Sequence, residues 1–373
     1  MAEGVAWLMR DPWQIAEFEL GPDEYFVVGD NRPHVHGTAH DGARGERPTD
    51  WPGAMVSRMP FTIDLQFLGR PRVIATAAIP CDGGVVLVDP GPSSCRAALD
   101  QGLARHGYGL GDVRALLLTH IHLDHAGVAG SLAQAYPGLP VYVHEFGAKH
   151  LASPEKLLAS ATRLYGADMQ RLWGEFLAVP SEALRALGGG ETLDIAGLRF
   201  DVLYTPGHAV HHVSYRDRAD AIAYVGDAAG IAVRPGYVLP ATPPPDIDLE
   251  RWATTLDDLE AWRPARLFLT HFGEVADPSV HLAAYRVALA RAAEGVRQTL
   301  LGVGDEAVGS ASWTGWLRAD VRSVLTEEEA LAVEAAAPFE QLWQGLARYW
   351  RKRREREGIA LAASRPATQG ENR

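Results

Sequence analysis

The sequence predicts an α/β fold of the α+β type, with strands and helices intermixed in a central region and helices alone after it. Short strand-like runs and helical patterns follow one another between residues 59 and 275. Hydrophobic residues make up 47% of the chain and charged residues 22%, which is typical of globular domains. The 373 residues suffice for one large domain with additions or for two domains.

Residues 1–58 are predicted to form an irregular extension, because they are rich in Gly, Pro, Asp, His and Arg and show no sustained periodicity. Within this extension, the GDNR sequence of Asp23–Arg32 resembles a box of the type I signal peptidases. Those enzymes work with a Ser/Lys pair, and no lysine precedes Lys149. We therefore expect no peptidase activity from this segment.

A first strand-rich half begins at residue 59, where alternating or short apolar runs are separated by helical periodicity. Strands are expected at 61–68, 72–80, 83–91, 113–120 and 139–145, and helices at 93–108 and 126–137. Ser93 or Ser94 is a suitable N-cap for the first helix, and Pro137 ends the second. Residues 148–190 are predicted to be mostly helical up to a run of glycines.

A second strand-rich half follows, and a helical region follows that. A hairpin is expected at 191–208, strands at 211–217, 221–230 and 265–273, a proline-rich loop at 239–248 and a helix at 249–262. The chain is therefore predicted to carry its main α+β domain at 59–275. A helical C-terminal subdomain is expected at 276–357, and a disordered tail at 358–373.

The strongest functional signal is the sequence THIHLDHAG, which contains His120, His122, Asp124 and His125 directly after a buried strand. A loop at a strand end can point alternate side chains the same way, so His120 and His122 can share one metal while the other two turn toward another. Imidazole and carboxylate groups are the ligands that zinc and iron accept in proteins. The motif therefore predicts a metal site at the end of this strand.

Three further residues stand at predicted strand ends: His208 in TPGHAVHH, Asp227 in AYVGDAAG and His271 in LFLTHFG. Each alone is more often structural, but their order after the first motif resembles the metallo-β-lactamase superfamily. Within that superfamily, the chain is similar to the binuclear, glyoxalase II-like hydrolases over roughly residues 61–272. The resemblance implies an αββα sandwich with metals at one edge of its two sheets.

The resemblance also implies a site for two divalent metal ions, with zinc expected and iron or manganese as alternatives. It assigns His120, His122 and His208 to the first metal, and Asp124, His125 and His271 to the second. Asp227 matches the residue that bridges the two metals. Asp124 is expected, in addition, to orient the attacking hydroxide. All seven positions hold the expected ligand type, which disfavours an inactive member of the family.

Three residues outside the ligand set are candidates for supporting roles. Asp89, in LVDPG, matches a family position near the site and is expected to support a ligating histidine, although a turn aspartate before a proline is an equal alternative. His212 lies four residues after His208, and a structural or supporting role is expected for it. His144, at the end of LPVYVHE, is expected either to line the pocket or to be a loop histidine.

The remaining composition bears on location and partners. A formal charge of −12 argues against a surface that coats nucleic acid. Cys81 and Cys95 are too few for a disulfide framework, and the first twenty residues lack the apolar region of a signal peptide. We expect a cytoplasmic protein that acts on a small molecule, without membrane or nucleic-acid partners. The sequence leaves the oligomeric state open.

The predicted function is metal-dependent hydrolysis of a small ester, thioester or lactone by a hydroxide that bridges the metals. A phosphodiesterase or nuclease of the same fold is the first alternative, and an acidic chain without a recognisable RNA-binding motif argues against it. An iron-dependent, dioxygenase-like oxidoreductase is the second alternative. No rhodanese or flavodoxin domain is recognisable in the sequence to support that reading.

Overall fold

The computed structural model describes residues 5–11, 14–19, 59–302 and 305–357. The chain divides into two compact units, residues 1–57 and 58–373. In the first unit β1 (Val5–Asp11) and β2 (Gln14–Glu19) form an antiparallel hairpin where we predicted irregular chain. Because both strands are short, they show no sustained periodicity in the sequence, and only their pairing makes them recognisable as strands. The GDNR segment and the predicted disordered tail lie outside the described residues.

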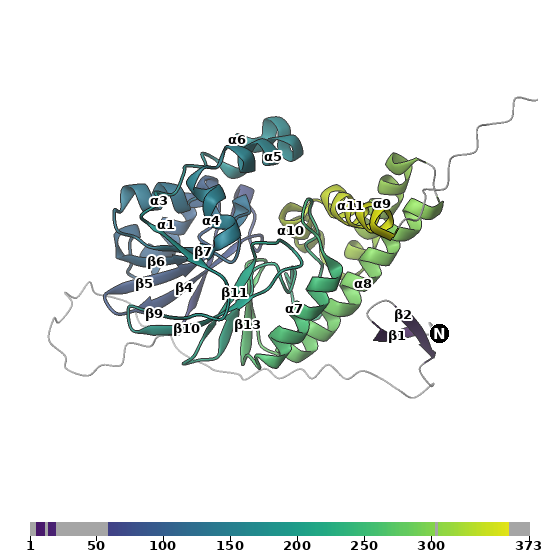
Figure 1. Ribbon diagram of the computed structural model, residues 1–373, viewed down its shortest axis with the longest axis horizontal. Helices are drawn as coiled ribbons and strands as arrows, with labels where there is room; N and C mark the ends of the chain where they lie inside the picture. The colour runs from purple at the N-terminus through teal and green to yellow at the C-terminus, as the bar shows by residue number, and fades with distance from the viewer. Residues whose placement is uncertain (1–4, 12–13, 20–58, 303–304, 358–373) are drawn as a thin grey trace, which may run out of the picture. The chain divides into compact units, whose positions relative to one another are not determined.

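The second unit contains two six-stranded sheets (Figure 1). The strands of the first sheet are, in spatial order, β3 (Phe61–Asp64), β4 (Ala75–Cys81), β5 (Gly84–Val88), β6 (Val113–Leu117), β7 (Val141–His144) and β8 (Leu184–Leu187). Antiparallel pairing joins β3 to β4 and β4 to β5, whereas β5 through β8 are parallel. The carboxyl ends of these parallel strands therefore lie at one edge of the sheet.

The second sheet is mostly antiparallel. Its strands are, in spatial order, β14 (Gly273–Val275), β13 (Arg266–Leu269), β12 (Ile222–Tyr224), β11 (Val213–Asp217), β10 (Leu198–Tyr204) and β9 (Thr192–Ile195). The pair β12 and β13 is parallel. The loops that follow β12 and β13 therefore leave the same edge of this sheet.

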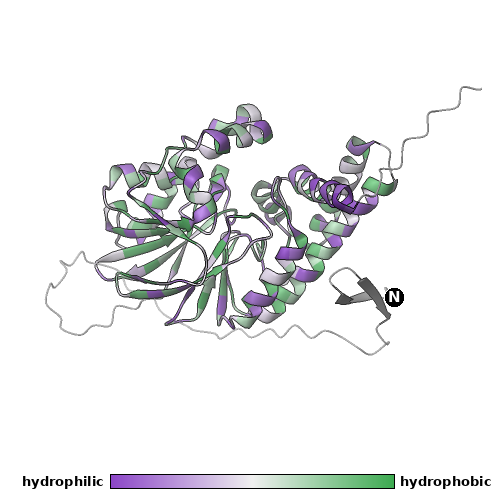
Figure 2. Cartoon of the chain, in the orientation of Figure 1, coloured by the Kyte–Doolittle hydropathy of each residue, from purple (hydrophilic) through white to green (hydrophobic). Residues whose placement is uncertain are grey.

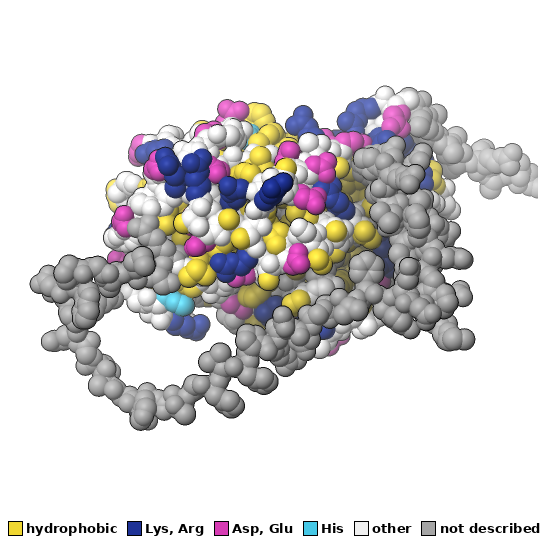
Figure 3. Space-filling view, turned by 90° about the horizontal axis from the view of Figure 1, so that it is seen from below, with side chains coloured by type: hydrophobic (Ala, Val, Ile, Leu, Met, Phe, Trp, Pro, Cys, Tyr) yellow, Lys and Arg dark blue, Asp and Glu magenta, His cyan; other side chains and the backbone are white. Residues whose placement is uncertain are grey.

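The two sheets pack face to face around the main hydrophobic core. This core joins side chains of the first sheet, such as Ile79 and Leu117, to side chains of the second, such as Phe200 and Tyr224, and all four are buried. Figure 2 shows that hydrophobic residues are concentrated in the strands and hydrophilic residues on the helices. Acidic and basic side chains are interspersed on the face seen in Figure 3.

Helices cover both outer faces of this sandwich. The first sheet is covered by α1 (Arg96–Arg105), α3 (Ala129–Ala135) and α4 (Glu145–Ala152), and α7 (Leu249–Ala261) and α8 (Pro278–Gly302) lie beside the second sheet (Figure 1). The short α2 (Leu123–Ala126) lies within the His-rich motif. The αββα arrangement predicted from the sequence is therefore confirmed.

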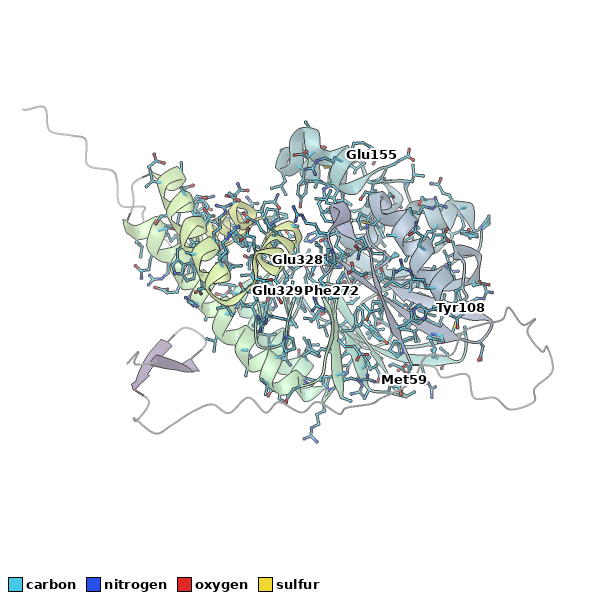
Figure 4. All side chains as sticks on the ribbon, turned by 180° about the vertical axis from the view of Figure 1, so that it is seen from behind. Met59, Tyr108, Glu155, Phe272, Glu328 and Glu329 are labelled. Carbon is cyan, nitrogen blue, oxygen red and sulfur yellow. The ribbon has the colours of Figure 1, made fainter. Side chains whose placement is uncertain are left out.

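Two further groups of helices stand on the same side of the sandwich. They are α5 (Glu155–Tyr165) with α6 (Met169–Trp173), and α9 (Glu306–Val324) with α10 (Glu327–Ala336) and α11 (Phe339–Glu357) (Figure 1). The guanidinium of Arg72 lies 4.8 Å from the ring centroid of Phe272, just after β13. At the start of α10, Oε2 of Glu329 lies 3.7 Å from Nη1 of Arg234; Phe272 and Glu329 are labelled in Figure 4. This ion pair joins α10 to the loop between β12 and α7.

Two local predictions were wrong. Residues 184–187, expected in a mostly helical region, form β8 because Leu184 and its successors pair in parallel with β7, so tertiary pairing overrides local propensity. Ser93 and Ser94 do not cap α1; their hydroxyls donate instead to backbone carbonyls of Gly127 and Leu172. Among the described helices, none is long and apolar enough to cross a membrane.

Candidate metal centre

The residues singled out in the sequence meet at one edge of the sandwich because each follows the end of a strand. Asp89 follows β5, and the motif from His120 to His125 follows β6. From the second sheet, Asp227 follows β12 and His271 follows β13. His208 lies in the loop after β10. Two sheets thus supply side chains to a single cluster.

Three histidine nitrogens converge within this cluster and form what we call the first donor group. The Nδ1 atom of His122 lies 2.9 Å from Nε2 of His120 and 3.0 Å from Nε2 of His208. Three nitrogens bound to one tetrahedral zinc ion would lie about 3.3 Å apart. The spacing is close to that of a three-histidine metal site.

A second donor group lies beside the first and consists of Asp124, His125 and His271. The Oδ2 atom of Asp124 lies 3.3 Å from Nε2 of His271 and 3.7 Å from Nε2 of His125. Both histidines are buried, whereas the Asp124 side chain is 18% exposed. The mixed oxygen and nitrogen donors suit a divalent transition metal.

Asp227 lies between the two donor groups. Its Oδ2 atom is 3.4 Å from Nε2 of His208 in the first group. Its Oδ1 atom faces the second group, 3.3 Å from Nε2 of His125 and 3.5 Å from Nε2 of His271. One carboxylate therefore presents one oxygen to each group.

Four of the histidines are fixed by a partner on the ring nitrogen that faces away from the cluster. Nδ1 of His208 lies 2.8 Å from the carbonyl oxygen of Ala241, and Nδ1 of His271 lies 2.7 Å from that of Val73. In the other two histidines, His120 and His125, Nδ1 contacts Thr119 Oγ1 at 3.1 Å and Asp89 Oδ2 at 2.8 Å respectively. A carbonyl can only accept, so Nδ1 carries the proton in His208 and His271, which leaves Nε2 free to bind a metal.

Asp89 is the centre of the supporting hydrogen bonds. It is fully buried, and its Oδ1 accepts from the backbone N–H of Thr119 at 2.8 Å. Its Oδ2 accepts from the hydroxyls of Thr119 and Thr270, each at 2.7 Å, and contacts His125. Asp89 also has a positive φ of 48°, a backbone conformation that non-glycine residues rarely adopt. The carboxylate thus links the ends of β5, β6 and β13.

The charges of the cluster fit a bound cation. Among buried polar atoms of the described residues, Nε2 of His125 and Oδ1 of Asp227 have no hydrogen-bond partner. Burial lowers the pKa of every histidine in the first donor group, which keeps their imidazoles neutral as metal ligands must be. Burial also lowers the pKa of His125, but neighbouring carboxylates, Asp124 first, outweigh it and raise that pKa well above its ordinary range. The neighbouring carboxylates therefore favour a positive charge at Nε2 of His125.

The backbone approaches the cluster closely at Gly226, just before Asp227. Gly226 has a positive φ of 47°, and a Cβ atom added there would lie 2.4 Å from Oγ1 of Thr119 and 2.9 Å from Nε2 of His212. A side chain larger than hydrogen would therefore displace the groups that support the donors.

The other histidines considered from the sequence take different positions. His212 is fully buried, and its Nδ1 lies 2.7 Å from Oγ1 of Thr205. His144 accepts a hydrogen bond from the N–H of Phe146 and stacks on Tyr204, with ring centroids 4.6 Å apart. His144 does not line the cavity that reaches the cluster, whereas His211 does.

Two threonines of the support were missed in the sequence, although a signal was present. Thr119 and Thr270 both bind Asp89 and both immediately precede a histidine of the cluster. The same tripeptide, Leu-Thr-His, occurs at the end of β6 and at the end of β13. Repetition of this tripeptide at two strand ends could have indicated that the hydroxyls share one partner.

A cavity of about 430 Å³ opens onto the cluster. His122, Asp124 and Asp227 contribute to its floor. Its walls come from α5 and α6, from the proline-rich loop at 243–245, and from the junction of α10 and α11. The volume lies in the range of small-molecule sites, so a small ligand can reach the donor groups.

An αββα sandwich with a His/Asp cluster at the ends of its strands defines a class of metal-binding α/β proteins. A sequence model of the metallo-beta-lactamase superfamily matches residues 81–271. A metallo-beta-lactamase fold-containing protein from Sulfurisphaera tokodaii is 31% identical over 208 residues, covering 54% of this chain and 74% of that protein. This chain belongs to the metallo-beta-lactamase superfamily, whose members are generally hydrolases.

Other relatives are similar over a smaller part of their length. A hydroxyacylglutathione hydrolase from Xanthomonas campestris pv. campestris is 31% identical over 179 residues, which cover 48% of this chain and 54% of that enzyme. The chain thus spans about half the length of this relative. Glyoxalase II-like similarity is therefore present but weak.

Solved structures agree on the fold. An archaeal metallo-beta-lactamase superfamily protein from Sulfolobus tokodaii has a TM-score of 0.53 at 23% identity, covering 78% of this chain and 98% of that one. A metallo-beta-lactamase family protein from Thermus thermophilus has a TM-score of 0.57 at 24% identity, covering 75% of this chain and 89% of that one. At this identity the two structures support the fold alone.

Proposed function

We propose that this protein is a binuclear metal-dependent hydrolase that cleaves an ester, thioester or lactone. The observation that carries the proposal is the position of Asp227, whose two oxygens face two separate donor groups. A carboxylate in that position suits two metal ions that share a ligand. We further propose that residues 59–275 carry the chemistry and that the helices of 276–357 complete the substrate cavity.

In this proposal the first donor group would hold one divalent ion and the second would hold another, and Asp227 would offer one carboxylate oxygen to each. Zinc is the expected metal, since histidine nitrogens and carboxylate oxygens are among its usual ligands. When bound, such a pair supplies a water that ionises near neutral pH and a positive charge beside the substrate oxygen.

The protein's own residues would hold and orient the reactants. Asp124 lies on the cavity floor with its side chain 18% exposed, so its carboxylate can accept a hydrogen bond from the attacking water. Asp89 holds His125 in place through Nδ1. Apolar walls around the floor exclude bulk water, which strengthens every electrostatic interaction with the developing charge.

The cavity also bears on the choice between carbonyl and phosphodiester substrates. Its walls include Leu157, Leu164, Trp173 and Leu342, whereas a nucleic-acid site needs clustered basic side chains along a groove. This composition favours a compact carbonyl compound over a nucleic acid.

The first test is metal analysis of the purified protein together with activity on a panel of substrates. The panel contains aryl esters, thioesters including a hydroxyacylglutathione, lactones and bis-p-nitrophenyl phosphate. We expect about two zinc ions per chain and turnover of a carbonyl substrate. His122→Ala and Asp227→Ala should lose metal together with activity, by a factor on the order of a thousand or more. The matched control is His106→Ala, because His106 is exposed and its ring stacks on Phe61 rather than on a member of the cluster.

Different results would assign a different function. Faster cleavage of bis-p-nitrophenyl phosphate than of every carbonyl substrate would assign a phosphodiesterase. One tightly held iron with oxygen consumption and no hydrolysis would assign an oxidoreductase. A protein that binds no metal under any loading condition would contradict the proposal as a whole.

A further inference from the structure

The cavity above the candidate metal centre has an apolar wall that the chemistry of hydrolysis does not itself require. Leu157 and Leu164 contribute to it from α5, and Leu342 contributes from α11. The ring of Trp173 packs 5.4 Å from that of Phe67, centroid to centroid, which fixes it in the wall. A wall of this kind stabilises an apolar ligand by removing its surface from water.

Apolar side chains continue to the mouth of the cavity, where they are exposed. Phe146 is 45% exposed and Val210 is 42% exposed, and both line the cavity. Large apolar side chains exposed at a cavity mouth are a feature of ligand-binding surfaces. The apolar surface thus extends from the candidate metal centre to the entrance.

Cationic side chains stand beside this apolar surface. The chain has three lysines, Lys149, Lys156 and Lys352, and the first two line the cavity. Both are exposed and come from different helices, α4 and α5. Within the part of the chain that the structure describes, neither ammonium group has a hydrogen bond or ion pair to the protein. They are therefore available to a ligand.

Other titratable groups at the same rim leave a positive balance. His150 lies close to both lysines, and burial together with their charges lowers its pKa, so it is neutral at pH 7. Asp246 also lines the cavity and lies close enough to His150 to oppose this shift. Away from the metal-binding carboxylates, two ammonium groups thus face a single carboxylate. An anionic group on a ligand would be attracted to this rim.

We propose that the substrate is an anionic amphiphile: an ester or thioester with an apolar acyl chain of several carbons and a carboxylate or phosphate group. The acyl chain would pack against Leu157, Leu164 and Trp173, while the anion would pair with Lys149 and Lys156. The scissile carbonyl would then lie between these two regions, above Asp124 and Asp227. This inference rests on the hydrolase function proposed above and specifies its substrate class.

Hydrolysis tests the apolar wall. With the metal-replete enzyme, kcat/KM is measured for thioesters of 3-mercaptopropionate with acetyl, butanoyl, hexanoyl and octanoyl groups. We expect kcat/KM to rise about fourfold for each CH2 that the wall removes from water. Leu164→Trp, which fills part of the wall, should move the preferred acyl chain to a shorter length. A flat profile in the wild-type enzyme would overturn the assignment of the wall.

Binding tests the lysines without requiring turnover. The probes are 3-(octylthio)propanoate, a thioether that cannot be hydrolysed, the neutral alcohol 3-(octylthio)propan-1-ol, and 2-(octylthio)ethyl phosphate. Calorimetry should give about tenfold tighter binding of the anions than of the alcohol, because two exposed ion pairs form. The double variant Lys149→Ala with Lys156→Ala should lose this preference, and Lys352→Ala, on α11, should retain it. The tighter of the two anions identifies a carboxylate or a phosphate as the natural group.

The two experiments separate this inference from the proposed function. Turnover of neutral short esters with equal binding of the anionic and neutral probes would overturn the inference and leave the hydrolase intact. Chain-length and charge preferences in binding without any turnover would support the cavity assignment and contradict the hydrolase. Equal binding of all probes by the wild-type and double-variant proteins would overturn the role of the lysines.

Discussion

The candidate metal centre and the cavity above it are built from different kinds of side chain. The centre is made of polar side chains at strand ends, and four of its histidines are each held by a second polar group, as His125 is held by Asp89. The cavity wall is made of apolar side chains from α5, α6, α10 and α11, which lie outside the two sheets. Hydrogen bonds fix the positions of the donor atoms in the centre, whereas the wall provides apolar surface against which a ligand can pack.

This difference predicts that substitutions in the two regions have different effects. Hydrogen-bonded donors demand particular residue types at particular positions, so changes there should abolish metal binding and chemistry together. An apolar wall accepts any set of side chains with a suitable volume, so changes there should alter which substrate binds while the metal remains. Each prediction below tests whether a given residue behaves as a member of one region or of the other.

The largest effect is expected for Asp89→Asn. An asparagine keeps the acceptor for the Thr119 N–H but loses the charge and an acceptor that serve His125 and two threonine hydroxyls. Metal affinity should fall by about 10- to 100-fold, and the metal-free protein should lose about 3–5 kcal/mol of unfolding free energy. Competition titration with a zinc chelator and chemical denaturation measure the two quantities.

The control for this change is Asp100→Asn, an exposed aspartate on α1. It should leave both quantities unchanged within about 0.5 kcal/mol. Unaltered zinc affinity in Asp89→Asn would place Asp89 outside the metal centre and make it a turn residue, the alternative that the sequence left open.

A smaller effect, on stability, is expected for Gly226→Ala. The new Cβ would lie 2.8 Å from Cβ of Thr119, in addition to its contacts with polar atoms. We expect a loss of about 1–3 kcal/mol in unfolding free energy from this overlap, measured by denaturation of the metal-free protein. Gly138→Ala is the matched control, because Gly138 also has a positive φ, of 92°, but nothing lies within 4 Å of its added Cβ. Equal losses in both variants would show that φ alone matters at Gly226.

Part of the candidate metal centre could be predicted from the sequence because the constraints on it are local. The His120–His125 motif holds four members of the cluster within six residues, directly after β6. His208, Asp227 and His271 are scattered, and only the order of strand ends indicated that they belong together. The αββα fold was implied by the resemblance of these motifs to the metallo-β-lactamase superfamily.

The cavity could not be predicted, since no periodicity marks a wall assembled from distant segments. Leu164 and Leu342 are ordinary helix residues in the sequence, and the fold brings both to one cavity. Lys149 and Lys156 belong to no motif in the sequence, because their nearness to one another depends on how α4 and α5 meet. Likewise, β8 forms because it pairs with β7, and the sequence of residues 184–187 alone does not reveal that pairing.

The smallest effect is expected for Tyr165→Phe, which tests the boundary between the two regions. Tyr165 lines the cavity, and its ring lies 5.0 Å from that of Trp173, centroid to centroid. Burial and the nearby Asp124 raise the pKa of its hydroxyl, while the side chain of Gln341 opposes the rise. The hydroxyl therefore stays protonated at neutral pH and can donate to a substrate oxygen above the metal centre.

Loss of one neutral hydrogen bond should lower kcat/KM by about 2- to 10-fold while zinc content stays at the wild-type value. Tyr108→Phe is the control, because Tyr108 packs on Phe61 away from the cavity and is visible in Figure 4. A fall in kcat at constant KM would place the hydroxyl with the chemistry, since the bond would form only in the transition state. A rise in KM alone would place it with the wall, and kinetics identical to those of Tyr108→Phe would remove Tyr165 from both regions.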